Sequence, residues 1–431
     1  MKRKIESKLL AWKNSPDRKP LLVYGARQVG KTFSIVDFGK SHYTDIVYLN
    51  FEGNSLLCNI FEKDLEPKRI ISEIEVFSGK KIYAGETLIV FDEIQECEKA
   101  LTSLKYFCEQ APEYHIIAAG SLLGLAINRG HFSFPVGKVN MITMYPLDFE
   151  EFLMALERED LVNLIKEAYN QNAQLEVPIH LKMMEYYYNY LTVGGMPAAV
   201  NAYVNKNDYD YVKIAQSEIQ SSYYGDMTKY TDIKDSNKII ATYRSIPSQL
   251  ARENKKFQYK LIGSGARAST YESCIDWLGT AGVVYRCNKT TSGFVPLKIN
   301  EDFSSYKIYM SDIGLLSNSL GVNINSLLSG NLSSVAKGAL AENYVMQQLK
   351  TSGFDPNYWE SEGKAEVDFV IQLEDGVVPV ECKYAENVQA KSLNVFIKKY
   401  SPKYAIRISA KNFGFENNIK SVPLYAVFCI K

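Results

Sequence analysis

The sequence predicts a multidomain α/β protein, and three observations support that fold class. Its 431 residues exceed what one hydrophobic core holds and suggest roughly three domains at about 150 residues each. In the first third, short apolar runs such as LLVYG and TLIVFDE alternate with amphipathic stretches, which predicts a parallel sheet with crossover helices. Helical periodicity replaces the strands from Pro146 to about Glu253, and a second α/β pattern follows later in the chain.

These patterns divide the chain into four expected regions. We expect a parallel-sheet domain over residues 1–145, a helical region over 146–235, a mixed module over 236–330 and a last α/β domain over 331–431. The last region reads as a helix from Ala339 to Lys350, the strands EVDFVIQL and VPVECKY, a helix from Ala390 to Lys399, and the strands YAIRIS and PLYAVF.

Composition and charge exclude several classes of protein. With 46% hydrophobic, 12% aromatic and 23% charged residues, the chain is typical of a folded protein rather than a disordered or fibrous one. The 49 basic residues balance the 49 acidic ones, so a globally basic nucleic-acid binder is not indicated, although local patches remain open. No apolar run approaches the roughly 20 residues that cross a bilayer, and the amino terminus lacks a signal-peptide core.

The cysteine and histidine content limits the cellular compartment and the kind of metal site that we expect. The seven cysteines form no CxxC pair, and their odd number is poorly suited to a closed disulfide framework, which favours a reducing compartment. The four histidines are too scattered for a His/Cys zinc site, so we expect any metal to be bound by oxygen atoms. The sequence thus predicts a cytoplasmic protein without a membrane partner.

A phosphate-binding loop follows the first apolar strand. Eight residues fit the pattern GxxxxGK[ST] without a mismatch, between the strand LLVY and an amphipathic helix. They are Gly25, Ala26, Arg27, Gln28, Val29, Gly30, Lys31 and Thr32. In such a loop the backbone N–H groups and the helix N-terminus face the phosphates, the lysine reaches the β- and γ-phosphates, and the hydroxyl holds Mg²⁺. The motif predicts ATP and Mg²⁺ as cofactors.

Two carboxylates follow a later buried strand. The run TLIVFDE ends in Asp92 and Glu93, at the carboxyl end of the strand, where open α/β sheets bind ligands. We interpret the pair as a Walker B element in which Asp92 binds Mg²⁺ and Glu93 polarises the attacking water. The strand HIIAAG leads to Ser121, which is placed to sense the γ-phosphate, although Gly-Ser after a strand is also a common turn.

Residues 236–330 have a helix-helix-strand-strand order that suggests a winged helix. In that module the helix near Arg267 to Trp277 would face the major groove of DNA. Short helix pairs joined by Gly-rich turns also occur in ordinary cores, and Arg267 is nearly the only base-reading residue of the segment. Both interpretations stay open.

The chain resembles the bacterial and archaeal AAA-type ATPases that pair an N-terminal P-loop domain with a C-terminal domain described as of unknown function. The resemblance rests on RKPLLVYGARQVGKT, YLNFE, IVFDEIQ, AGSLLG and YPLDFEEF, and then on YLTVGGMPAAV, KFQYKLI, YMSDIGLL, AEVDFVI and VPVECKY. Members commonly have Gly-Arg where this chain has Gly137-Lys138, so an arginine finger is not carried over there. Arg129 is an alternative, but a loop arginine without a role is the simpler interpretation.

The carboxyl-terminal region resembles restriction-endonuclease-like nucleases. Asp368 and the run Glu381-Cys382-Lys383 have the D…ExK order of that superfamily, and Glu342 resembles its additional acidic residue on the preceding helix. Two carboxylates bind a second Mg²⁺ or Mn²⁺ through oxygen, and the lysine stabilises charge on a scissile phosphate. The resemblance implies a catalytic set of Glu342, Asp368, Glu381 and Lys383, with the metal held by Asp368 and Glu381.

The turn between the two strands makes that geometry testable. Asp375-Gly376 is a strong signal for a two-residue hairpin loop, which would pair Glu374 with Val377 and place Asp368 opposite Lys383. Period-two alternation would then put Glu381 on the same side. The alternative is a solvated polar face with a cross-strand ion pair worth less than about 1 kcal/mol.

Two functional hypotheses follow. In the first, ATP hydrolysis controls a winged-helix and nuclease-like half that acts on DNA. In the second, the chain is a switch in which ATP controls binding of a DNA or protein partner and the nuclease-like fold cuts nothing. An oligomer is compatible with either hypothesis.

Overall fold

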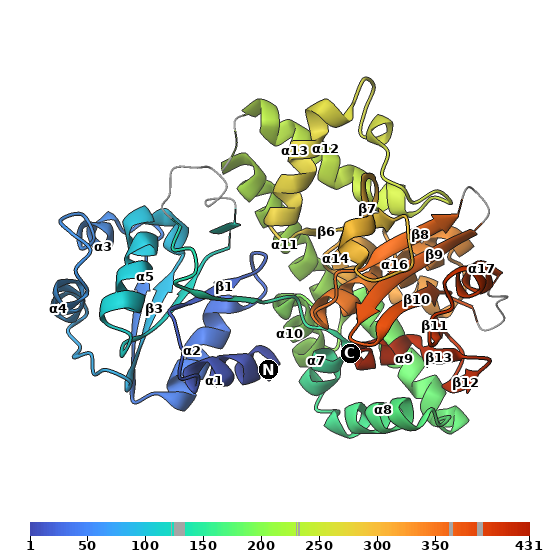
Figure 1. Ribbon diagram of the computed structural model, residues 1–431, viewed down its shortest axis with the longest axis horizontal. Coiled ribbons are helices and arrows are strands. Elements are labelled where there is room, and N and C mark those ends of the chain that lie inside the picture. The colour runs from blue at the N-terminus through green and yellow to red at the C-terminus, as the bar shows by residue number, and fades with distance from the viewer. Residues whose placement is uncertain (122, 125–133, 230, 232, 362–364, 386–390) are drawn as a thin grey trace. The chain divides into compact units, whose positions relative to one another are not determined.

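The computed structural model describes residues 1–121, 123–124, 134–229, 231, 233–361, 365–385 and 391–431 (Figure 1). Contacts between residues divide the chain into two compact units. The N-terminal unit comprises Lys2–Tyr145 and Thr280–Gly282, and the C-terminal unit comprises Pro146–Gly279, Val283–Lys431 and Met1. Each unit has its own sheet.

The N-terminal unit is built on a five-stranded sheet in the order β2-β3-β4-β1-β5, in which every pairing is parallel. The strands are β1 (Leu21–Tyr24), β2 (Asp45–Asn50), β3 (Thr87–Asp92), β4 (His115–Ala119) and β5 (Asn140–Thr143). The helical elements are α1 (Ile5–Lys13), α2 (Lys31–His42), α3 (Ser55–Asn59), α4 (Pro67–Ser78), η1 (Ile94–Glu96) and α5 (Glu98–Gln110). The parallel sheet expected from the sequence is confirmed.

The apolar runs of this unit form strands because they are buried on both faces. Every residue of β3 and β4 is buried, as is typical of the central strands of a parallel sheet. One core cluster joins strand residues such as Ile89 and Phe91 to Ile74 of α4 and Leu104 of α5. Since β4 lies between β3 and β1, the carboxyl ends of these three strands meet at one edge of the sheet.

The C-terminal unit begins with a helical region, which confirms the helical middle of the chain. Its helices before the first strand of the second sheet are α7 (Phe149–Ala155), α8 (Glu159–Gln171), α9 (Val177–Val193), α10 (Pro197–Lys206), α11 (Tyr209–Lys229), α12 (Ile233–Leu250), η2 (Tyr259–Leu261) and α13 (Ala268–Thr280). Helix α9 presents Tyr187 and Tyr190, both fully buried, to Tyr344 in edge-on ring contacts. The tyrosine-rich run KMMEYYYNYL thus supplies packing.

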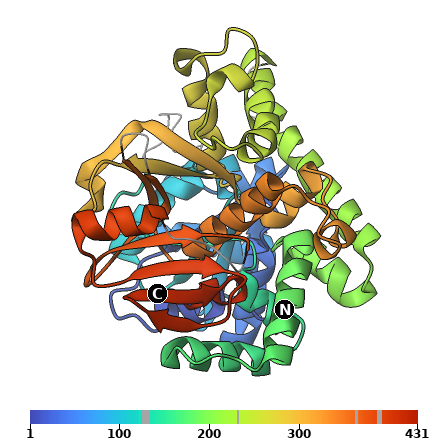
Figure 2. The same ribbon diagram turned by 90° about the vertical axis from the view of Figure 1, so that its right-hand side faces the viewer.

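A mixed sheet of eight strands organises the rest of this unit, in the order β12-β13-β11-β10-β9-β8-β6-β7. The strands are β6 (Val284–Thr290), β7 (Glu301–Met310), β8 (Asn357–Ser361), β9 (Ala365–Leu373), β10 (Gly376–Cys382), β11 (Ala405–Ser409), β12 (Gly414–Glu416) and β13 (Ile419–Pro423). The remaining helical elements are η3 (Leu297–Asn300), α14 (Ile313–Ser319), α15 (Ile324–Leu328), α16 (Ser334–Thr351), α17 (Lys391–Tyr400) and η4 (Leu424–Cys429). Figure 2 shows the orange and red strands side by side.

This sheet crosses the boundary expected at residue 330. Strands β6 and β7 precede that residue and pair with each other antiparallel, while β6 also pairs with β8 in parallel. The order helix, helix, strand, strand is present as α12, α13, β6 and β7. The winged-helix assignment and the division into four regions remain predictions.

The hairpin between β9 and β10 differs from the expected one. Gly376 pairs with Leu373, so the loop consists of Glu374 and Asp375 rather than Asp375 and Gly376. The register runs to Phe369 opposite Val380, and the expected pairing of Asp368 with Lys383 is therefore wrong. Gly376, at φ +136°, follows the turn, a position that glycine favours in type I turns.

A second irregularity lies within β9, away from the turn. Val370 pairs with Asn357 and Val367 pairs with Trp359, so β9 has one residue more than β8 between these two pairs. Such a β-bulge bends the strand locally and re-aims its side chains. Asp368 and Phe369 are the residues between the two pairs, and simple period-two alternation does not hold there.

The expected last strand, PLYAVF, is also wrong. Strand β13 ends at Pro423, and residues Leu424–Cys429 form the 3₁₀ helix η4. All six residues of η4 are buried. A fully buried apolar run shows no periodicity that separates strand from helix, which explains the error. Among the described residues, no helix combines the length and apolar character that a bilayer crossing needs.

Two distant sequence motifs meet in the core of the C-terminal unit. Gly195 donates its N–H to Asp312 Oδ2 over 2.6 Å, and Leu147 N donates to the Gly195 carbonyl over 2.7 Å. Asp312 also caps α14 by accepting from Leu315 N. A Cβ at Gly195 would lie 1.9 Å from the Leu147 carbonyl oxygen, so only glycine fits this junction.

Replacing that glycine tests the junction. Gly195→Ala should destabilise the C-terminal unit by roughly 1–3 kcal/mol, because the added methyl group must displace backbone atoms. Urea unfolding followed by tryptophan fluorescence measures the loss. Gly225→Ala is the matched control, because Gly225 lies in α11 with open space around its Cβ position, and it should be neutral or slightly stabilising. Equal stability of the two variants would contradict this account.

Candidate functional site

The phosphate-binding loop connects β1 to α2 and depends on glycine conformations. Gly30, at φ +94°, is the N-cap of α2, and Gly25 has φ +143°. A Cβ at Gly25 would lie 2.2 Å from the Met144 carbonyl oxygen, so this position also excludes a side chain. The buried Lys31 donates hydrogen bonds to the carbonyls of Gly25 and Ala26 over 2.8 and 2.9 Å. The loop therefore wraps around the lysine at the start of a helix, as an anion site requires.

Asp92 lies opposite the loop and accepts two hydroxyl groups. Thr32 Oγ1 and Tyr48 OH each donate to Asp92 Oδ2 over 2.7 Å. The Glu93 N–H donates to Asp92 Oδ1 over 3.1 Å. The structure thus brings together the hydroxyl and the carboxylate that hold Mg²⁺ in P-loop sites. Their hard oxygen donors fit that ion.

Glu93 is held at the same edge of the sheet in a left-handed backbone conformation, at φ +49°. Its Oε2 accepts from Gln95 Nε2 over 2.6 Å and from Ser121 Oγ over 3.3 Å. The Ser121 backbone N–H also points to this oxygen, over 3.4 Å. The strands β3, β4 and β1 are neighbours in the sheet. Their carboxyl ends therefore bring the phosphate-binding loop, Asp92, Glu93 and Ser121 together at one edge.

Sequence reasoning missed two partners in this site, Tyr48 and Gln95. Tyr48 lies in β2, which pairs with β3 so that Asn50 aligns with Asp92. Burial and the neighbouring Asp92 raise the pKa of Tyr48, so its hydroxyl stays protonated and donates. The motif YLNFE carried the signal, because a tyrosine near the end of a strand beside Walker B can reach its carboxylate. Gln95 is only two residues beyond Glu93.

Two positions bear on the question of an arginine finger, Lys138 and Arg129. Lys138, which stands where related chains have arginine, forms an ion pair with Glu109 over 2.9 Å. Arg129 lies outside the residues that the structure describes.

A second polar cluster lies where β9 and β10 part, beyond their last pair. Lys383 Nζ is 2.7 Å from Glu381 Oε1 and 3.9 Å from Asp368 Oδ2. Asp368 Oδ2 also accepts the Cys382 N–H over 2.9 Å. The structure therefore brings Asp368, Glu381 and Lys383 together, although by the strand ends and the bulge rather than by the expected pairing. The two carboxylate side chains are only 9% and 4% exposed.

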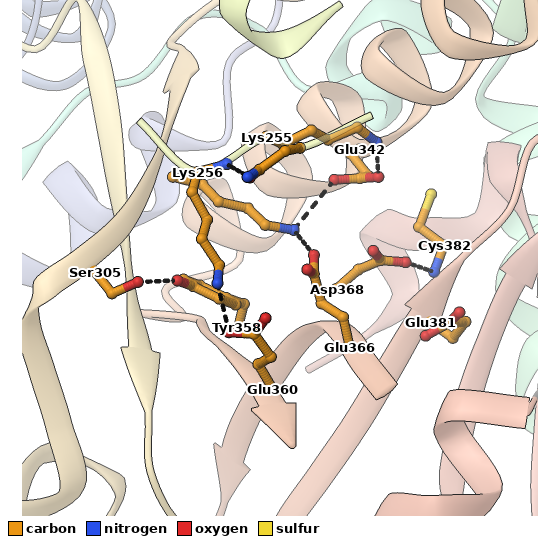
Figure 3. A network of polar contacts seen from close by, with 12 residues as sticks. Lys255, Lys256, Ser305, Glu342, Tyr358, Glu360, Glu366, Asp368, Glu381 and Cys382 are labelled. Carbon is orange, nitrogen blue, oxygen red and sulfur yellow. Dashed lines mark hydrogen bonds and ion pairs between the residues drawn. The ribbon is translucent and has the colours of Figure 1, made fainter. Parts of the chain in front are cut away.

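Glu342 of α16 lies close enough to this cluster that, after burial, it helps to raise the pKa of both Asp368 and Glu381, and lysines contact it in turn (Figure 3). Its Oε1 is paired with Lys255, and its Oε2 lies 3.7 Å from Lys307 Nζ and 3.3 Å from the donating hydroxyl of Tyr309. Lys307 also pairs with Glu366 over 2.5 Å. We call the set of Glu342, Glu366, Asp368, Glu381, Lys255, Lys307 and Lys383 the carboxylate–lysine cluster.

Burial and neighbouring charges give the carboxylates of the cluster different pKa values. Burial, then the nearby Asp368, raises the pKa of Glu381 to about 8, against the opposing effect of Lys383. Burial and Glu342 raise the pKa of Asp368 as well. Burial also acts to raise the pKa of Glu342, but Lys255 and Lys307 outweigh it, so that pKa is lowered. Glu342 is thus ionised, whereas Glu381 holds a proton near neutral pH.

The cluster has oxygen donors that suit a divalent cation, but lysines occupy much of it. Among the described residues, no group of three or more His, Cys, Asp or Glu side chains is arranged to hold a metal ion. One observation nevertheless fits a cation. Glu381 Oε2 is buried and, in the part of the chain described, has no hydrogen-bond partner. A buried carboxylate oxygen of this kind is costly unless something binds it.

Sequence reasoning also missed Lys255 and Lys307. Lys255 lies 87 residues before Glu342, in a segment without helix or strand, and no spacing rule joins the two. Lys307 lies within β7, where a charged side chain would be expected on the exposed face of an alternating strand, yet its side chain is only 1% exposed.

The stability of the chain against pH tests the buried state of Glu381. Its pKa is about 8 in the folded chain and 4.5 ordinarily, so the folded chain holds a proton that the unfolded chain has lost between these pH values. The resulting stabilisation is complete below about pH 4.5 and is lost as pH rises through about 8. Glutamine does not titrate, so the stability of Glu381→Gln does not fall in this way. The free energy of unfolding of Glu381→Gln minus that of the wild type should therefore increase from about pH 5 to 9, measured by urea unfolding in the presence of a chelator.

Glu360→Gln is the matched control for that titration. Burial acts to raise the pKa of Glu360, but Lys256 and Lys289 lower it overall. The ionised Glu360 therefore stabilises the folded chain at every pH above the ordinary pKa of a glutamate. The difference in stability between Glu360→Gln and the wild type should be constant from about pH 6 to 9. If the difference in stability between Glu381→Gln and the wild type is also constant over this pH range, Glu381 is ionised in the folded chain and the expected raised pKa is wrong.

Comparison with known proteins adds three family matches. Residues 17–153 match a family described as an AAA domain. Residues 184–326 and 337–427 match two families described as domains of unknown function, DUF8612 and DUF4143. No curated protein sequence matches the chain.

Among solved structures, the chain is similar to a Walker-type ATPase of Pyrococcus abyssi, with 15% identity and a TM-score of 0.46, over 74% of this chain and 95% of that one. It is similar to the ORC1 protein of Aeropyrum pernix in complex with DNA, with 13% identity and a TM-score of 0.31, over 77% and 94%. A third is the RuvB Holliday junction branch migration motor of Thermotoga maritima, with 14% identity and a TM-score of 0.30, over 66% and 90%.

The family match and the geometry agree on the N-terminal unit. The loop before α2, the Thr32–Asp92 contact and the parallel strand order all lie within the matched residues. Residues 17–153 therefore form an AAA-type P-loop ATPase domain, the class of domain that binds and hydrolyses ATP.

Proposed function

We propose that the chain hydrolyses ATP with Mg²⁺ in its N-terminal unit and uses this to control a nuclease-like site in its C-terminal unit that acts on DNA. The second part rests on one observation above all, which is the meeting of Asp368, Glu381 and Lys383 at the parting ends of β9 and β10. The first part rests on the groups around the phosphate-binding loop.

In the ATP site each residue has a separate task. Lys31 and the backbone N–H groups of the loop bind the phosphates, while Thr32 and Asp92 hold Mg²⁺. Glu93 orients the attacking water and takes its proton, and the hydrogen bonds from Gln95 and Ser121 fix its carboxylate. Tyr48 positions Asp92 by donating to the oxygen that Thr32 also contacts.

In the C-terminal site Asp368 and Glu381 would hold Mg²⁺ or Mn²⁺, and Glu342 would complete the acidic set. A bound divalent cation supplies an activated water and neutralises charge on the scissile phosphate. Lys383 is 36% exposed and lies between the two carboxylates, where its ammonium group can stabilise a phosphate oxygen.

The alternative function is a switch that binds a DNA or protein partner under the control of ATP and cuts nothing. A specific observation favours it, because Lys255 and Lys307 both lie close to the Glu342 carboxylate and balance its charge. The winged-helix interpretation of α12, α13, β6 and β7 suits both functions.

Substitution of Glu93 tests the ATP site. Glu93→Gln should bind ATP but hydrolyse it at least about 10²-fold more slowly, because the amide is a poor base. Phosphate release and nucleotide affinity are measured on the same preparations. Lys31→Ala is the contrasting variant and should lose nucleotide affinity. Unchanged hydrolysis by Glu93→Gln would refute the assignment of Glu93.

Substitution of Asp368 tests the C-terminal site. The full chain is incubated with single-stranded, duplex and branched DNA, with and without ATP, in Mg²⁺ or Mn²⁺. The wild type should cleave at least one substrate, and Asp368→Ala should not, while its ATP hydrolysis stays measurable. Asp355→Ala is the matched control, because Asp355 is exposed and pairs with Lys350. If the wild type binds DNA but cuts none of these substrates, the switch is the function that remains.

A further inference from the structure

The three lysines of the carboxylate–lysine cluster are held in different ways. Lys307 belongs to β7 and is almost fully buried, so it cannot leave without disrupting the sheet. Lys383 directly follows β10 and contacts both Asp368 and Glu381. Lys255 lies within a segment, residues 251–258, that has neither helix nor strand, whereas the backbone N–H of Lys383 donates to the Ile408 carbonyl of β11 over 2.8 Å.

Lys255 also takes a position that a cation would need. It pairs with Glu342 Oε1, and the other carboxylate oxygen of Glu342 is engaged by Tyr309 and Lys307. Both oxygens of Glu342 therefore already have positively charged or donating neighbours, whereas Glu381 Oε2 is buried without a partner among the described residues. Figure 3 shows Lys255 beside Glu342, with Asp368 in the same cluster.

An ammonium group and a divalent cation cannot share Glu342 at low cost. Like charges at a few ångströms repel strongly in a buried site, where little water screens them. One of the two must leave, and the Lys255 side chain, which is 14% exposed, has a path to solvent. The adjacent Lys256 is anchored to Glu360 over 2.5 Å, so the segment can stay in place while Lys255 swings out.

We propose that Lys255 is a displaceable counter-ion that competes with a divalent cation for Glu342, so that withdrawal of this one side chain opens the C-terminal metal site. The inference rests on the metal site of the proposed function and adds its regulation. A change in the segment between α12 and η2 then governs metal binding without any change in the sheet that holds Asp368 and Glu381.

Calorimetric titration with Mn²⁺ tests the competition. The full chain without nucleotide is titrated as wild type, Lys255→Met and Lys256→Met, with Asp368→Asn as the baseline for other sites. Lys255→Met should bind Mn²⁺ more tightly than the wild type by about tenfold, a typical size for coupling between two ligands. Lys256→Met is the matched control, because this neighbouring lysine contacts Glu360 instead, and it should match the wild type.

Footprinting of the unaltered chain covers the case in which Lys255→Met does not fold. An amine-acylating reagent should label Lys255 several-fold faster when Mn²⁺ is bound, while Lys307 stays protected. Equal or weaker Mn²⁺ binding by a folded Lys255→Met, or unchanged labelling of Lys255 with Mn²⁺ bound, overturns the competition but leaves the metal site standing. If no form of the chain binds Mn²⁺ above the Asp368→Asn baseline, both the competition and the proposed metal site are wrong.

Discussion

The pairing of Glu342 with Lys255 and Lys307 is the constraint on which the C-terminal unit depends. Removing one partner from a buried ion pair typically costs about 3–5 kcal/mol, because the other charge is left without compensation. The partners come from α16, from β7 and from the segment after α12. Helices and strands far apart in the chain must therefore assemble together, and β6 and β7 join the same sheet as β9 and β10.

The two polar sites differ in the groups that contact their buried carboxylates. In the N-terminal unit the hydroxyls of Thr32 and Tyr48 both donate to Asp92 Oδ2. In the C-terminal unit ammonium groups contact the carboxylates instead, and Glu381, although paired with Lys383 over 2.7 Å, keeps a raised pKa because burial and Asp368 outweigh that lysine. Hydroxyl groups can remain when a cation arrives, because a hydroxyl oxygen can ligate it, whereas in the proposed competition Lys255 must leave Glu342.

The sequence predicted what local rules determine. The phosphate-binding loop, Asp92, Glu93 and Ser121 were all placed from a motif and strand ends, because a parallel sheet gathers its carboxyl ends at one edge. Asp368, Glu381 and Lys383 meet as expected, but the turn at Glu374-Asp375 and the bulge at Asp368 bring them together by another geometry. The observed register differs from the expected one by two residues, which is one side-chain period, so that displacement alone keeps each side chain on its expected face.

Motifs and strand periodicity could not predict the contacts made by residues from distant segments of the chain. Tyr48 reaches Asp92 only through the pairing of β2 with β3, and Lys255 and Lys307 reach Glu342 only through the packed fold. Anomalous scattering from a crystal of the full chain in Mn²⁺ tests the account most directly. It predicts a Mn²⁺ peak between Asp368 and Glu381, with Lys255 withdrawn from Glu342. A structure with no Mn²⁺ peak there, or a peak with Lys255 still on Glu342, would contradict it.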